Sequence, residues 1–98
     1  MTDRELLEAA AQAAGITRRE ESGAFLLDDG RWTWNPLIDD GDALRLAVRQ
    51  KLEIRFGKFD VMVHQGFARA HAEAYGDDPD AATRRAIVRA AAEIGRTK

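Results

Sequence analysis

The segment from residue 32 to residue 48 constrains the fold more than any other part of the chain. Trp32 and Trp34 lie two apart, as neighbours on one face of a strand do. Pro36 has no amide to donate and keeps Asn35 extended, so the strand should end near Asn35. Three acids follow at Asp39, Asp40 and Asp42. Acids favour a helix start, where backbone amides are unpaired, and the segment therefore indicates structure rather than chemistry.

Three helices are expected. Thr2 and Glu5 have the spacing of a capping box, and Gly15 can close the same helix, which should run over residues 3–14. The acids above cap a helix over residues 43–51 with Leu44, Ala47 and Val48 as its apolar face. Asp78 and Pro79 begin a last helix that runs to about residue 94.

Short alternating segments predict the strands. Residues 24–27 and 31–34 flank a turn at 28–30, and residues 54–56 and 59–63 flank a second one at 57–58. Residues 67–75 are ambiguous, since their alanines favour a helix while their alternation favours the third strand of a meander. We adopt the strand.

These elements predict one α+β domain spanning residues 1–98, with element order αββαβββα. Its antiparallel sheet would have four to five strands, with the three helices on one face. A small open sheet leaves unpaired edges, so a homodimer through a sheet edge or the open face is a plausible partner arrangement.

Composition narrows the function classes. The chain has no cysteine, which excludes disulfides and thiolate chemistry, and no apolar run approaches the ~20 residues that span a bilayer. We therefore expect a cytoplasmic protein without a membrane partner. Residues 1–43 hold ten acids against four arginines, and residues 44–98 hold seven acids against eleven basic residues. Such an asymmetry can steer a charged partner.

Few residues suggest catalysis. His64 and His71 are the only histidines; a zinc site would need a third ligand, so structural roles are favoured. The acidic segments 39–42 and 77–80 lack the spacing of a calcium loop and are better explained as helix caps. No nucleophile or phosphate-binding motif is present. We expect no metal, no cofactor and no enzymatic activity.

Two groups of residues remain as binding candidates. Trp32 and Trp34 could pack in the core or form an exposed binding platform, and the core is favoured. Arg85, Arg89 and Arg96 share one side of the last helix. Such a stripe is most often solvated, although it could also meet phosphates or an acidic protein surface.

Three blocks of the chain, residues 1–16, 34–48 and 76–96, resemble a family of small tailed-phage and prophage proteins of proteobacteria, including proteins labelled NinX-like. The shared features are the Asn35-Pro36 turn, the helix after it and the last helix rich in Arg and Ala. The resemblance implies a phage product acting in the host cytoplasm, and assigns no catalytic residue.

We therefore predict a non-enzymatic accessory protein that binds a host protein, as an inhibitor of host defence (anti-CRISPR-like) or of host regulation. The alternative is a nucleic-acid-binding regulator that uses the arginines of the last helix. An overall pI near 5.6 favours the first prediction over the second.

Overall fold

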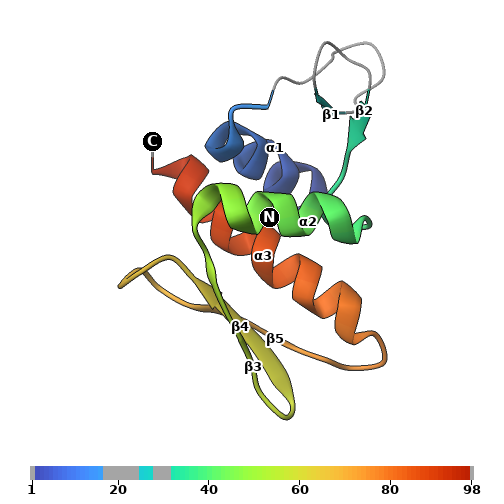
Figure 1. The fold of residues 1–98 in the computed structure, drawn as a ribbon, viewed down its shortest axis with the longest axis vertical. Coiled ribbons are helices and arrows are strands. Elements are labelled where there is room, and N and C mark those ends of the chain that lie inside the picture. Colours follow the sequence, from blue (N-terminus) through green and yellow to red (C-terminus); the bar gives the residue numbers. More distant parts are fainter. Residues whose placement is uncertain (1, 17–24, 28–31, 98) are drawn as a thin grey trace.

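The computed structural model describes residues 2–16, 25–27 and 32–97, and Figure 1 shows their arrangement. The elements in chain order are α1 (Asp3–Ala14), β1 (Phe25–Leu27), β2 (Trp32–Trp34), α2 (Asp40–Gln50), β3 (Glu53–Phe56), β4 (Asp60–His64), β5 (His71–Ala74) and α3 (Pro79–Arg96). The α+β class and the predicted order are confirmed, and the ambiguous segment 67–75 contains a strand. The turn expected at 28–30 lies outside the described residues.

The strands form two sheets, so the prediction of one sheet with four to five strands was wrong. β1 and β2 make an antiparallel pair, and β3, β4 and β5 make a separate antiparallel sheet in that order. Figure 1 places the two sheets at opposite ends of the molecule, with the helices between them. The Asn35-Pro36 turn leads directly into α2, and the helical layer keeps β2 from reaching the second sheet.

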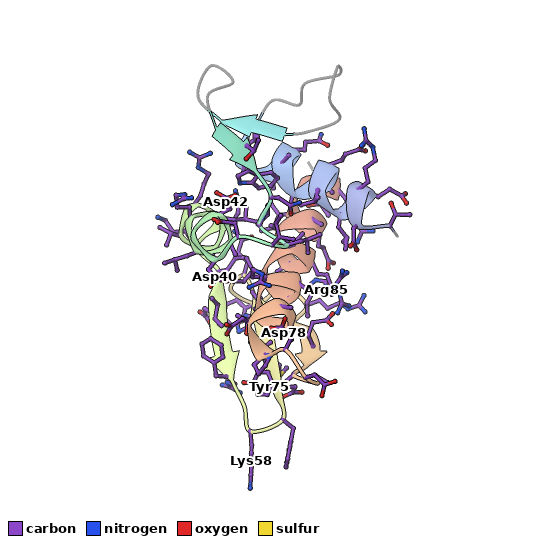
Figure 2. All side chains as sticks on the ribbon, turned by 90° about the vertical axis from the view of Figure 1, so that its right-hand side faces the viewer. Asp40, Asp42, Lys58, Tyr75, Asp78 and Arg85 are labelled. Carbon is purple, nitrogen blue, oxygen red and sulfur yellow. The ribbon has the colours of Figure 1, made fainter. Side chains whose placement is uncertain are left out.

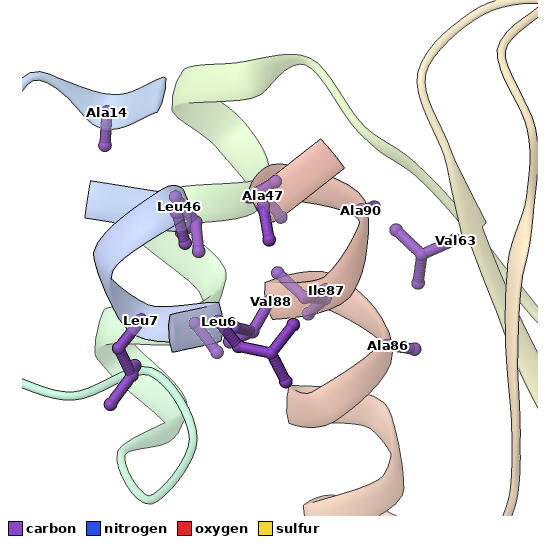
Figure 3. Packing of buried hydrophobic residues seen from close by; sticks show 14 of the residues in the cluster. Leu6, Leu7, Ala14, Leu46, Ala47, Val63, Ala86, Ile87, Val88 and Ala90 are labelled. Atoms are coloured by element: carbon purple, nitrogen blue, oxygen red, sulfur yellow. The ribbon is translucent and has the colours of Figure 1, made fainter. Parts of the chain in front are cut away.

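Helix α3 is the centre of the fold because it is buried on two sides. Figure 3 shows Ala86 and Ala90 directed towards Val63 of the sheet, while Val88 lies among α1 and α2 residues. Its approach to α1 is close: a Cβ added to Gly95 would lie 1.9 Å from the Ala9 carbonyl oxygen. Small residues permit this approach, and five of the seven buried residues of α1 are alanines.

The three-stranded sheet packs one face on α3. Val61 and Val63 of β4 are fully buried there, and Asp60, Met62 and His64 alternate with them, as the period of two predicts. The opposite face of the sheet carries exposed residues such as Ala72 and Ala74. The sheet is thus covered on one side only by the described elements.

Helix α2 packs with a different face from the predicted one. Leu44 and Val48 are 60% and 61% exposed, so their assignment to the apolar face was wrong, whereas Ala47 is buried as expected. Hydrogen bonds explain this rotation, because Gln50 donates to the Ala13 carbonyl at 3.0 Å. The α1 carbonyl obtains a partner, and α2 turns Leu46 inwards and Leu44 outwards.

Candidate functional site

The Asn35-Pro36 turn and the acids after it form one structural network. The Asn35 amide donates to the Asp42 carboxylate at 2.9 Å, and the Asp42 amide donates to the carboxylate of Asp39, the N-cap of α2, at 2.8 Å. Asp42 is buried, and Arg45 donates to its other carboxylate oxygen at 2.8 Å. Both oxygens are used within the protein, which supports the capping interpretation of this segment. In the described part of the chain, no three His, Cys, Asp or Glu side chains are placed to share a metal ion.

The two histidines lie on adjacent strands but on opposite faces of the sheet. His71 stands opposite Val63 and is buried against α3, whereas His64 stands opposite Glu53 on the other face. The Nε2 atom of His64 lies 3.2 Å from the Glu53 carboxylate. A metal ion or substrate could not contact both rings from one side, so the sheet provides no two-histidine site.

His71 instead joins the sheet to α3. Its Nε2 atom lies 2.5 Å from the Glu93 carboxylate, and its Nδ1 atom is buried without a hydrogen-bond partner among the described residues. A cavity of about 180 Å³ adjoins the pair, with Arg69 and Thr97 in its lining. The arrangement provides one oriented imidazole with no adjacent nucleophile, which makes it a packing contact rather than a reaction centre.

The arginines of α3 face carboxylates of neighbouring elements. Arg85 donates to Asp3 of α1 at 2.8 Å, and Arg89 forms an ion pair with Glu73 of β5. Arg84, which was not among the candidates, donates to Asp40 at 2.6 Å. Arg96 is exposed in the last turn of α3. The predicted stripe is therefore divided between two sides of the fold, and Figure 2 shows Arg85 on the α1 side.

The tryptophans do not form a platform in the described structure. Trp34 is 4% exposed and belongs to the core cluster, in agreement with the favoured interpretation. The backbone of Trp32 pairs with Leu27, but its side chain lies outside the described residues. Only the edge of Trp34 takes part in the surface, as one wall of a groove.

This groove is the most developed concave surface with apolar walls that the described residues form. It encloses about 610 Å³ between the end of α1, the end of β2 and the outer side of α2. Its apolar residues are Ala14, Ile16, Trp34, Leu44, Leu46 and Val48. The exposed Leu44 and Val48 lie one turn apart on α2, where they can insert into an apolar surface of a partner.

Basic residues surround the apolar part of the groove. Arg45, Arg49 and Lys51 line it, and no acidic residue does so among the described ones. Arg45 shares its charge with buried Asp42, whereas Arg49 donates to the Ala14 carbonyl at 2.7 Å and keeps its net charge. The groove, defined as the surface around Leu44 and Val48 with Arg45, Arg49 and Lys51, is apolar inside and positive at its border.

Sequence reasoning missed this groove because it placed Leu44 and Val48 in the core. A signal was nevertheless present: Arg45, Arg49 and Lys51 alternate with these apolar residues along α2, a pattern typical of a helix that is half exposed. The position of Gln50 decides which stripe is buried, and its partner in α1 is distant in sequence.

Comparison with known proteins adds no assignment, because no family model, no curated protein and no solved structure matches the chain significantly. The described residues also include no helix that is both long and apolar enough to cross a membrane.

Proposed function

We propose that the chain is a non-enzymatic binding protein whose groove on α2 takes an apolar segment of a partner protein with acidic residues beside it. The observation that carries this proposal is the exposure of Leu44 and Val48 within a ring of basic residues. Exposed leucine and valine on a small domain gain free energy when a partner covers them. The basic border selects partners whose flanking residues are negative.

The resemblance to phage proteins adds a context to this proposal. In that context the partner is a host protein, and occupation of the groove inhibits host defence or regulation in the bacterial cytoplasm. An amphipathic helix with acidic flanks suits a groove of this shape, because its apolar face covers Leu44 and Val48 while its acids meet the border.

The alternative role, a nucleic-acid regulator that uses the last helix, has weaker support. Arg84, Arg85 and Arg89 each face a carboxylate of the same chain, so phosphates would have to displace these partners. We therefore keep nucleic acid as an outcome of the test and not as a second proposal.

A peptide-binding assay with the intact chain tests the proposal. The probe is a fluorescent amphipathic helical peptide with leucines on one face and glutamates beside them, and the comparison peptide has lysines in place of the glutamates. We expect the acidic peptide alone to bind, with an affinity that falls as salt is added. Leu44→Asp with Val48→Asp should weaken this binding by at least about tenfold, because both apolar contacts are lost and two negative charges are added.

Phe59→Asp is the matched control. Phe59 is also an exposed apolar residue, but it adjoins Lys58 at the turn of β3 and β4, which Figure 2 shows at the far end of the molecule from β1 and β2. This variant should bind the acidic peptide like the original chain. Equal binding of both peptides, or equal loss in both variants, would contradict the proposal. Retention of DNA or RNA at low salt, lost in Arg85→Glu with Arg89→Glu, would support the alternative.

A further inference from the structure

The two edges of the three-stranded sheet differ. At the β5 edge, the amide of Tyr75 donates to the Phe59 carbonyl at 3.1 Å, which fixes the alternation of the β4–β5 ladder and directs the backbone of Ala72 and Ala74 outwards. Arg89 donates to the outward carbonyl of Ala72 at 3.1 Å. A side chain from α3 thus occupies this edge, which is a common way to protect it from further strands.

The β3 edge has no such cover in the described structure. The Gly57 amide donates to the Asp60 carbonyl at 2.8 Å, and the alternation then gives Arg55 and Glu53 the hydrogen bonds to β4. The backbone groups of Ile54 and Phe56 consequently point away from the sheet. Among the described strands, β3 pairs only with β4.

The side chains of β3 complement those of a second β3 in antiparallel orientation. If Ile54 stands opposite its own copy, then Glu53 stands opposite Arg55 and Leu52 opposite Phe56. Opposite charges meet on one face of the sheet, and apolar residues meet on the face towards α3. Phe56, which is 65% exposed in the single chain, gains an apolar neighbour.

Other symmetric registers are less favourable. Centring the pair on Arg55 places two arginines directly opposite each other, and like charges in that position are destabilising. Centring it on Phe56 places Arg55 opposite Gly57, which offers it no acid. Only the register centred on Ile54 combines outward backbone groups at the axis with paired charges on both sides.

We propose that two copies of the chain pair through β3 in the register centred on Ile54, which joins their sheets into one. The interface is isologous, so every contact occurs twice. It is also short, and a short strand pairing gives a weak, concentration-dependent dimer. This self-association surface is distinct from the groove on α2, and neither proposal depends on the other.

Cysteine crosslinking tests the register, because the chain contains no cysteine of its own. In the proposed register the Cα atoms of Ile54 and its copy are about 5.5 Å apart, within disulfide range. Ile54→Cys should therefore form a covalent dimer under mild oxidation at high protein concentration. Phe56→Cys is the matched control on the same face, where the copies lie more than about 10 Å apart. Crosslinking of Phe56→Cys instead would overturn the register.

A charge exchange tests the pairing without cysteine. Arg55→Glu places glutamates opposite each other at both ends of the pair and should raise the dimer dissociation constant about tenfold in sedimentation velocity. Adding Glu53→Arg to the same chain restores opposite charges and should restore the dimer. Glu53 and Arg55 are both exposed, so neither change threatens the fold. A chain that stays monomeric at millimolar concentration, or a double variant no better than the single one, would overturn the proposal.

Discussion

Helices α1 and α2 both pack on α3, but they use different residues for different ends. α1 turns a row of alanines inwards and approaches α3 so closely that Gly95 has no room for a side chain. α2 contributes Ala43, Leu46 and Ala47 to the core and leaves Leu44 and Val48 in solvent. Large apolar residues are thus kept outside where small ones form the interior.

The difference separates stability from interaction. Close packing of small residues stabilises by dense contact and tolerates little change in volume. Exposed leucine and valine add almost nothing to the folded state of the single chain, and their contribution appears when a partner covers them. We expect substitutions on the α1 side to change the free energy of unfolding, and substitutions on the outer side of α2 to change binding.

The largest effect is expected where α1 and α3 cross. Gly95→Ala places a Cβ 1.9 Å from the Ala9 carbonyl oxygen, a backbone atom that cannot rotate away. Alanine is favoured over glycine in a helix by about 1 kcal/mol, but the overlap outweighs this gain. We expect a net loss of about 3 kcal/mol in the free energy of unfolding, measured by urea denaturation.

Gly41→Ala is the matched control in α2. A Cβ at Gly41 would meet only the end of the Arg45 side chain and the Asp39 carboxylate, at 3.2 and 3.3 Å. The arginine can move, so the helix preference for alanine should leave stability unchanged or raise it by up to about 1 kcal/mol. If both glycine variants behave alike, the contrast between the two helices does not hold.

A smaller effect is expected where α2 is anchored. Asp42→Ala removes the acceptor for the Asn35 amide and for Arg45, and should lower the free energy of unfolding by about 2 kcal/mol in thermal or urea denaturation. Asp40→Ala is the comparison, since Asp40 is mostly exposed and its pair with Arg84 should contribute less than about 1 kcal/mol. A larger loss in Asp40→Ala would argue against Asp42 as the anchor.

Local chemistry made most helix ends predictable. The capping box of Thr2 and Glu5, the left-handed Gly15 and the Asp78-Pro79 start all depend on residues within one turn, and each is confirmed. The strand order followed from alternation and turns for the same reason. Such signals are read from a few neighbouring residues, so they need no knowledge of the tertiary fold.

Long-range contacts made the rest unpredictable. The division of the strands into two sheets depends on where α2 lies, and the buried side of α2 depends on Gln50 reaching Ala13. The roles of Arg85 and Arg89 depend on Asp3 and Glu73, which are distant along the chain. The candidate groove combines α1, β2 and α2, and no short segment contains its pattern.

The smallest effect is expected at the exposed start of α1, where it sharpens the contrast with Gly95 at the buried crossing. The Thr2 backbone amide, and secondly its hydroxyl, lower the pKa of the Glu5 carboxyl below its ordinary value. Because the folded pKa is the lower one, the stabilisation is present above the unfolded pKa and disappears as pH falls through the folded pKa. Thr2→Ala keeps the amide but removes the hydroxyl cap, which should cost about 1 kcal/mol. NMR titration should then find the pKa of Glu5 raised only part of the way, and an unchanged titration would assign the whole shift to the backbone bond.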